Sequence, residues 1–295
     1  MKKLMIAAAA MMAGVAMADV TSANIVGYNN LMHNEGGTHS PLFSLCFTPI
    51  NGATYTLLGD FKPMDGTSIV EDDCIQVIDP TSLAATKLFT YLDKTIADEI
   101  AVDEGGQPGD YDEFIGWWDE GIGIFEDDAK VDDYQVNIGD GFMGYFESES
   151  EVTFQSNGEA PTVSTSFTPN SEGTRSPVFA NYIPRDITLK YMAPVDGMAI
   201  VEDDCIQVID PTSLASTELF TYLDKTIADE IAVDEGGEPG DYDEFIGWWD
   251  EGIGIFEDDA RVDDFVVKAG FGFMGYFEAG NEITFQLPSS TATLD

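Results

Sequence analysis

Two acidic, glycine-containing loops hold the residues of this sequence that are best suited to chemistry. Calcium takes six to eight hard oxygen ligands, and flexible loops let several carboxylates converge on one ion. The candidate calcium ligands are five acidic residues in each loop: Asp103, Glu104, Asp110, Asp112 and Glu113 in the first, and Asp234, Glu235, Asp241, Asp243 and Glu244 in the second.

These loops depart from the EF-hand calcium pattern. After Asp110 and Asp112, Phe114 occupies the third ligand position, and Gly116 stands one residue late. The alternative is an acidic surface that only keeps the protein in solution, and the spread of acidic residues over every loop favours it. Calcium is therefore the one cofactor that we consider, and both interpretations stay open.

All four tryptophans lie in two adjacent pairs, Trp117–Trp118 and Trp248–Trp249. Neighbouring side chains of a strand point to opposite faces, so we expect one Trp of each pair in the core and the other outside. An outward Trp beside acidic loops would stack on a sugar ring, as in a carbohydrate-binding module. The alternative is that both are buried, one against each neighbouring layer.

The motifs of common enzymes are missing from the sequence. There is no Gly-x-Ser-x-Gly elbow, no His-Glu-x-x-His zinc motif and no phosphate-binding loop. The only two histidines are His33 and His39, so His-based metal sites have few ligands to draw on. Paired carboxylates would suit a glycosidase, but the acidic residues are too numerous for that criterion to single out a pair. We predict a protein that is not an enzyme.

Charge excludes two classes of partner. The 295 residues include 55 acidic and 12 basic side chains, which gives a formal net charge of −43. Nucleic acids and anionic membranes both attract clustered Lys and Arg, so we expect neither as a partner. Hydrophobic residues make up 44% and aromatic residues 12% of the chain, which argues against disorder. Glycans or other surface proteins remain as partners, and the oligomeric state stays open.

One long segment is written twice. Residues 71–134 reappear as 202–265, and 59 of the 64 aligned positions are identical. The two copies carry net charges of −16 and −19, most of the charge of the chain. The five differences between the copies are Ala85/Ser216, Lys87/Glu218, Gln107/Glu238, Lys130/Arg261 and Tyr134/Phe265.

Period-two patterns dominate each copy and predict strands. In the first copy and its flank we expect strands at 74–79, 87–92, 114–118, 141–146 and 151–155, and one short helix at 95–101. The predicted fold is all-β, with two tandem β-sandwich-like domains that arose by internal duplication. The expected boundaries are a signal peptide at 1–18, domains at 19–156 and 167–288, a linker at 157–166 and a tail at 289–295.

The first residues have the composition of a secretory signal. Two lysines precede an apolar stretch at 4–15, and Ala16-Met17-Ala18 offers small residues for cleavage. We therefore expect export to the periplasm, the cell surface or the extracellular space. Since no other apolar stretch is long enough to span a bilayer, we expect no membrane insertion once the signal is removed.

Three cysteines are an odd number for an exported chain. A disulfide would join Cys46 to Cys74 within the first copy, or Cys74 to Cys205 between the copies. The alternative is that they are buried thiols, which pack as small apolar groups.

The segment Ala23-Asn24-Ile25-Val26-Gly27-Tyr28 follows the expected cleavage site. With the strand at 75–79, a Gly-Trp strand and a Gly-x-Gly-Phe strand, it resembles a group of uncharacterised secreted bacterial β-rich repeat proteins. The resemblance implies a secreted β-rich module and supplies no activity. We predict a non-enzymatic structural or adhesive protein of the cell surface or extracellular space, with a calcium-dependent carbohydrate-binding module as the alternative.

Overall fold

The structure is a computed structural model that describes most residues from 25 to 294. The described ranges are 25–33, 40–45, 53, 55–63, 73–79, 82–123, 125–126, 128–146, 152–169, 176–195, 204–210, 215–254, 256–257, 259–277 and 282–294. The expected signal peptide, His39 and Cys46 lie outside these ranges, so the predictions that involve them stay predictions.

The first repeat is built on a five-stranded antiparallel sheet with the strand order β2-β9-β5-β6-β7. These strands are β2 (Leu42–Ser44), β9 (Gly141–Tyr145), β5 (Cys74–Ile78), β6 (Ala85–Leu92) and β7 (Gly116–Asp119). Two smaller sheets complete the repeat, with orders β1-β10-β4 and β3-β8. Their strands are β1 (Ile25–His33), β10 (Val152–Ala160), β4 (Phe61–Pro63), β3 (Tyr55–Leu57) and β8 (Gln135–Asn137).

The second repeat has the same arrangement of sheets. Its five-stranded sheet has the order β12-β19-β15-β16-β17, formed by β12 (Val178–Ala180), β19 (Gly272–Tyr276), β15 (Cys205–Ile209), β16 (Ser216–Leu223) and β17 (Gly247–Asp250). The smaller sheets are β11-β20-β14 and β13-β18, formed by β11 (Thr165–Phe167), β20 (Phe285–Leu287), β14 (Ala193–Pro194), β13 (Ile187–Thr188) and β18 (Val266–Val267).

Within the described residues, helices are few and short. Each repeat contributes one ten-residue α-helix, α2 (Lys94–Asp103) or α3 (Lys225–Asp234). The remaining helical turns are of the 3₁₀ type: η2 (Leu58–Asp60), η3 (Asp112–Phe114), η5 (Leu189–Tyr191) and η6 (Asp243–Phe245). The prediction of an all-β class is confirmed, and so is the predicted helix at 95–101. Within the described residues no helix is long and apolar enough to cross a membrane.

The main core of each repeat lies between the five-stranded sheet and the smaller sheets. In the first repeat, Phe43 and Trp117 from the large sheet pack against Phe61 and Phe154. The Phe61 and Phe154 rings stack with centroids 4.7 Å apart. Aromatic rings of this size supply most of the apolar area that such a small core buries. The second repeat builds its core in the same way, from Phe179, Trp248, Phe285 and their neighbours.

The two repeats join directly through their large sheets. Backbone bridges link Phe43 to Phe271 and Phe179 to Asp140, and these two bridges are related by the repeat itself. Two glycines make the close approach possible: a Cβ on Gly141 would lie 2.6 Å from Val178, and one on Gly272 would lie 2.6 Å from the Leu42 backbone. The junction is therefore a tight backbone contact between the two large sheets.

The described structure alters the predicted boundary between the domains. Residues 157–160 were expected in a linker, but they continue strand β10 and pair with the start of β1, as in the partners Ala160 and Ile25. The polar composition of this stretch misled the prediction, because strand pairing satisfies its backbone. The expected tail is also held in place, since the Arg185 guanidinium donates to the carbonyls of Ser289 and Ala292.

Of the alternatives left open for the cysteines, the structure agrees with buried thiols and not with a bridge between Cys74 and Cys205. Cys74 and Cys205 are both buried and carry thiols. Burial, with a smaller contribution from the charge of Glu120, raises the pKa of Cys74 to about 12. Both thiols therefore fit the alternative of small buried groups on strands.

Candidate functional site: two acidic lobes

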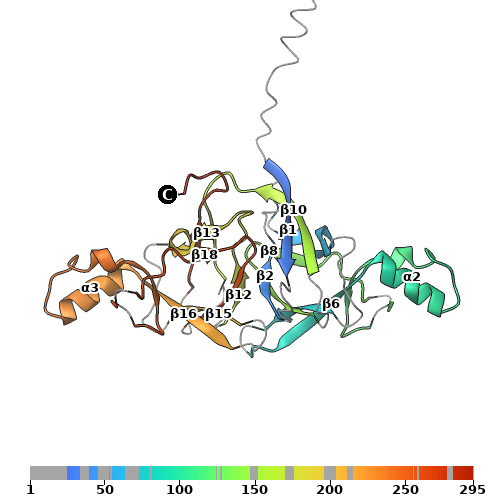
Figure 1. Ribbon diagram of the computed structural model, residues 1–295, viewed down its shortest axis with the longest axis horizontal. Helices are drawn as coiled ribbons and strands as arrows, with labels where there is room; N and C mark the ends of the chain where they lie inside the picture. Colours follow the sequence, from blue (N-terminus) through green and yellow to red (C-terminus); the bar gives the residue numbers. More distant parts are fainter. Residues whose placement is uncertain are drawn as a thin grey trace, which may run out of the picture.

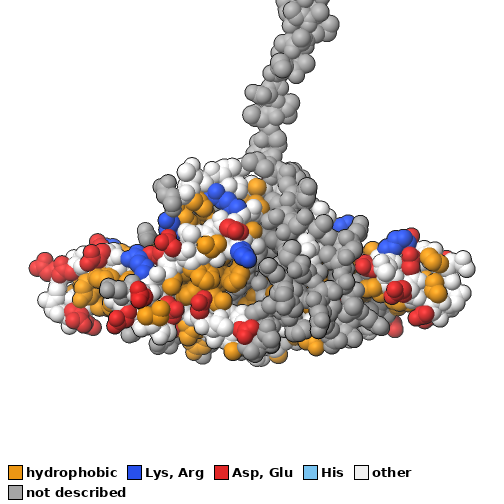
Figure 2. Space-filling view, viewed as in Figure 1, with side chains coloured by type: hydrophobic (Ala, Val, Ile, Leu, Met, Phe, Trp, Pro, Cys, Tyr) orange, Lys and Arg blue, Asp and Glu red, His pale blue; other side chains and the backbone are white. Residues whose placement is uncertain are grey.

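A helical lobe closes each end of the molecule. The first lobe comprises residues 93–133 and the second residues 224–264, and their helices α2 and α3 lie at opposite ends of the long axis (Figure 1). The first lobe segment carries 15 acidic and two basic side chains, and the second carries 16 and two. Acidic groups are accordingly visible at both ends in Figure 2. These lobes contain every candidate calcium ligand and all four tryptophans.

Helix α2 begins at a side-chain cap. The Asp93 carboxylate accepts a hydrogen bond from the Ile96 amide at 2.9 Å, which satisfies one of the free N–H groups of the first turn. Ala97 and Ala101 are buried and face the body of the lobe. The small size of these alanines lets the helix lie close to Trp118, which belongs to the same small core.

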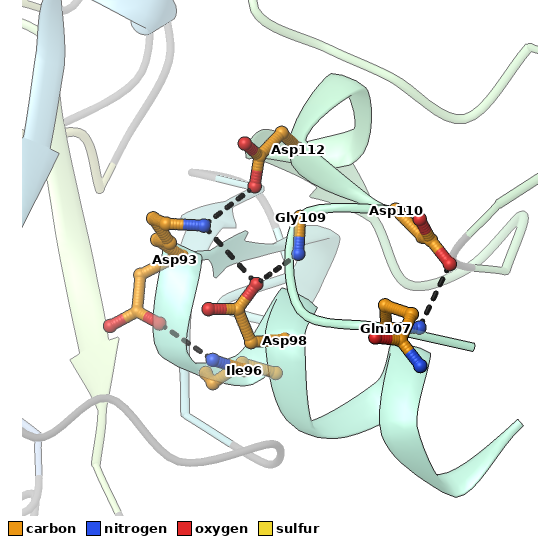
Figure 3. Close-up of polar contacts among 8 residues, drawn as sticks. Asp93, Ile96, Asp98, Gln107, Gly109, Asp110 and Asp112 are labelled. Carbon is orange, nitrogen blue, oxygen red and sulfur yellow. Dashed lines mark hydrogen bonds and ion pairs between the residues drawn. The ribbon is translucent and has the colours of Figure 1, made fainter. Parts of the chain in front are cut away.

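Carboxylates of the first lobe fix the loop that follows α2. Asp98 accepts a hydrogen bond from the Gly109 amide at 2.7 Å, and Asp110 accepts one from the Gln107 amide at 2.8 Å (Figure 3). Lys94 joins the helix to the end of the loop, because its Nζ lies 3.2 Å from Asp98 Oδ1 and 2.8 Å from Asp112 Oδ1. The hydrogen bond to Asp112, followed by that to Asp98, raises the pKa of Lys94.

The candidate calcium ligands of this loop do not converge on one point. Asp110 and Asp112 are engaged by Gln107 and Lys94, and the remaining candidates lie on the exposed surface: Asp103, Glu104 and Glu113. Among the described residues, no group of three or more His, Cys, Asp or Glu side chains is placed to hold a metal ion. Calcium binding stays a prediction, and a rise in melting temperature with millimolar calcium but not with magnesium would support it.

The second lobe repeats this network. Lys225 Nζ lies 3.2 Å from Asp229 Oδ1 and 2.8 Å from Asp243 Oδ1. Asp241 accepts a hydrogen bond from the Glu238 amide at 2.9 Å. The remaining candidate ligands of this lobe are again exposed: Asp234, Glu235 and Glu244.

Of the two alternatives for the tryptophan pairs, the structure agrees with burial of both members, and the expected outward tryptophan is wrong. Trp117, Trp118, Trp248 and Trp249 are 1%, 3%, 2% and 4% exposed. The strand does alternate, since Trp117 enters the main core and Trp118 the opposite face. That opposite face is covered by the lobe, where Trp118 Nε1 donates to the Phe114 carbonyl at 2.8 Å. The buried indoles offer no face on which a sugar ring could stack.

Phe125 closes the lobe over the second tryptophan, and sequence analysis missed it. Its ring lies 5.7 Å from that of Trp118 and 4.9 Å from that of Phe114. Its backbone has a φ of 74°, a left-handed conformation that a bulky residue adopts rarely. Phe256 of the second lobe has the same φ. Nothing in the apolar pattern of the loop distinguishes this position, so the sequence carries no signal for it.

A groove runs along the outer face of the first lobe, between α2 and the loop at Pro108. Its volume is about 490 Å³, and it is lined by Thr95, Asp98, Glu99, Val102, Asp103 and Pro108. The lining thus combines three carboxylates with an exposed valine and a proline ring. Val102 is 52% exposed and so adds apolar surface to the groove.

The lining residues of the groove all recur in the second lobe. Their counterparts are Thr226, Asp229, Glu230, Val233, Asp234 and Pro239. Comparison with known protein families, with curated proteins and with solved structures finds no match to this chain.

Proposed function

We propose that this protein is an exported, non-enzymatic adhesive protein that bridges two partners through its acidic lobes. One observation carries the proposal: two lobes with nearly the same sequence lie at opposite ends of one molecule (Figure 1). Two equal binding surfaces that face apart cannot both reach one small ligand. They are suited to two partners, or to two places on an extended partner.

The junction between the repeats supports a bridging role. The reciprocal bridges of Phe43 and Phe179 join the large sheets of the two repeats, and we expect them to restrict how the lobes move relative to each other. A rigid spacer loses less entropy on binding a second partner than a flexible linker of the same length does. The junction thereby favours two simultaneous contacts over repeated contacts at one end.

The charge of the lobes selects the partner. An excess of 13 or more negative charges on one lobe attracts cationic surfaces and repels anionic ones. This attraction acts over about 8 Å at physiological salt, so it requires close approach and weakens as salt is added. The carbohydrate alternative has lost its stacking residues, because all four tryptophans are buried.

Surface binding at two ligand densities tests the proposal. A basic peptide is immobilised sparsely or densely, and binding of the full chain is measured by interferometry. On the dense surface we expect binding at least about a hundredfold tighter than on the sparse one, because both lobes then engage. A variant with four carboxylates of the first lobe removed should lose most of this gain; it carries Glu99→Gln, Asp103→Asn, Glu104→Gln and Glu113→Gln, which lowers the excess of negative charge on the lobe from 13 to 9.

The matched control neutralises the same positions of the other lobe, with Glu230→Gln, Asp234→Asn, Glu235→Gln and Glu244→Gln. Each variant leaves one intact lobe, so both should lose the gain on the dense surface, whatever the affinity of the lobe that remains. A full chain that binds no cationic surface, or binds both densities equally, would contradict the bridging role.

A further inference from the structure

The groove of the first lobe has a lining that matches one kind of ligand. Helix α2 forms one wall, and the loop at Pro108 forms the other. Three of the six lining residues are acidic, and Val102 adds apolar surface beside them. We propose that this groove binds lysine or arginine side chains of a basic polypeptide; the proposal rests on the adhesive function and names its partner.

The groove offers apolar surface for the aliphatic stem of such a side chain and carboxylates for its cationic head. Lysine and arginine bury an aliphatic stem on apolar surface and keep the cationic head at a polar edge. Val102 and Pro108 supply the apolar surface, while Glu99 and Asp103 supply carboxylates for the head. Within the described residues, neither of these two carboxylates has an ion-pair partner, so both are available to a ligand.

The same helix already holds an ammonium group. Lys94 Nζ lies 3.2 Å from Asp98 Oδ1, and Asp98 also lines the groove. That pair shows that a carboxylate of this wall accepts an ammonium while it also binds the loop amide of Gly109. A ligand at Glu99 and Asp103 would repeat the contact one turn further along the helix.

The acidic residue at the C-terminal end of α2 opposes its helix dipole, whereas the Asp93 cap at the N-terminal end favours it. A helix is stabilised by acidic groups at its N-terminal end and basic groups at its C-terminal end. Here Lys94 is the first residue and Asp103 the last, and the last turn contains no basic residue. Glu99 and Asp103, four residues apart, also repel each other on one face. A cationic head in the groove would relieve both effects.

An organic cation suits this lining better than a single metal ion. A metal needs several oxygens around one point, and the described residues contain no such group of three. The groove instead spreads its carboxylates beside apolar surface. A lysine or arginine side chain is long enough to contact both.

Fluorescence anisotropy with a labelled lysine octapeptide tests the proposal on the full chain. The groove variant removes Glu99 and Asp103 of the groove and their counterparts in the second lobe, with Glu99→Gln, Asp103→Asn, Glu230→Gln and Asp234→Asn. The control removes four exposed carboxylates of the same lobes outside the grooves, with Glu113→Gln, Glu126→Gln, Glu244→Gln and Glu257→Gln. We expect about tenfold weaker binding for the groove variant and less than about threefold for the control.

A second variant tests the apolar part of the groove without a change in charge. Val102→Ser together with Val233→Ser should weaken octapeptide binding about threefold, because the stem loses its contact. Both valines are more than half exposed, so folding should survive, as circular dichroism will show.

Two results would contradict octapeptide binding in the groove: an equal loss of affinity in the groove variant and the control, or an unchanged affinity in the valine variant. Either would leave a diffuse acidic surface and the bridging role intact. Failure of the unaltered chain to bind any cationic surface would instead contradict the proposed function itself.

Discussion

Equivalent tryptophans in the two repeats differ in one hydrogen bond, and this difference predicts unequal stability effects. Trp117 Nε1 donates to the Phe61 carbonyl at 2.5 Å. Trp248 Nε1 is buried and has no acceptor among the described residues. Phe61 lies in strand β4 with a ψ of 114°, whereas its counterpart Met192 has a ψ of 60°, so the two carbonyls point in different directions.

Replacement of each tryptophan by phenylalanine separates the hydrogen bond from the packing. Both changes remove the same part of an indole from a similar core, since the two side chains are 1% and 2% exposed. Trp117→Phe also removes a hydrogen bond worth about 1 kcal/mol, while Trp248→Phe removes a buried N–H whose unpaired state costs about 1–3 kcal/mol. We therefore expect Trp117→Phe to destabilise the protein by about 2 kcal/mol more than Trp248→Phe.

Urea unfolding followed by circular dichroism measures both variants in the full chain. Agreement of the two free energies of unfolding within about 0.5 kcal/mol, or a larger loss for Trp248→Phe, would show that the two indole N–H groups are equally satisfied. The reasoning from the turn at Met192 would then be refuted.

Three further predictions concern the junction, the thiol and the lysine network. Gly141→Ala should lower the melting temperature strongly, because its Cβ would lie 2.6 Å from Val178, whereas Gly121→Ala, whose nearest neighbour is one Asp119 oxygen at 3.1 Å, should change it little; equal shifts would contradict the tight junction. Cys74 should resist iodoacetamide at pH 8 in the folded protein and react after unfolding, since burial raises its pKa to about 12; peptide mass spectrometry measures this, and rapid native labelling would be the opposite result. The pKa of Lys94 is raised above its ordinary 10.5, so its contribution to stability is fully present below that pH and is lost as the pH rises through the higher folded value. Lys94→Gln should accordingly lower the melting temperature at pH 8, and its effect should shrink as the pH is raised above 10.5; an effect that stays constant over this range would exclude the ion pairs as its cause.

The strands and the helix could be predicted because their patterns are local. Alternation at 74–79 and 87–92 predicted the β5–β6 hairpin, and the spacing of Ile96 and Ile100 predicted α2. Each pattern reflects which face of one element is buried, and that information lies within a few residues of the chain.

The burial of both tryptophans in each pair could not be predicted, because it depends on residues that are distant in the sequence. Alternation places Trp117 and Trp118 on opposite faces, and it does so correctly. Whether the second face is covered depends on α2 and on Phe125, which approach from elsewhere in the sequence. The groove has the same origin, because Val102 and Pro108 meet only after the loop has closed on Asp98.

Three of the five differences between the repeated segments lie outside the lobes, and the two inside them, Gln107/Glu238 and Lys130/Arg261, keep the residue polar or basic. Lys87 lies 4.8 Å from the Tyr134 ring as a cation–π pair, and both members change together, to Glu218 and Phe265. The basic residue at position 130 of the first lobe and 261 of the second keeps its contacts although its type changes. Lys130 donates to the carbonyls of Glu113 and Ile115, and Arg261 donates to the equivalent carbonyls of Glu244 and Ile246.

Only one difference reaches the loop beside the groove, where Gln107 becomes Glu238 and adds a carboxylate next to the proline. If the groove binds cations, the second lobe should hold them at least as tightly as the first. If cations bound to the whole acidic surface of a lobe, one additional carboxylate among 16 would change the affinity very little. A clear difference in affinity between the two lobes would therefore indicate that cations bind at the groove.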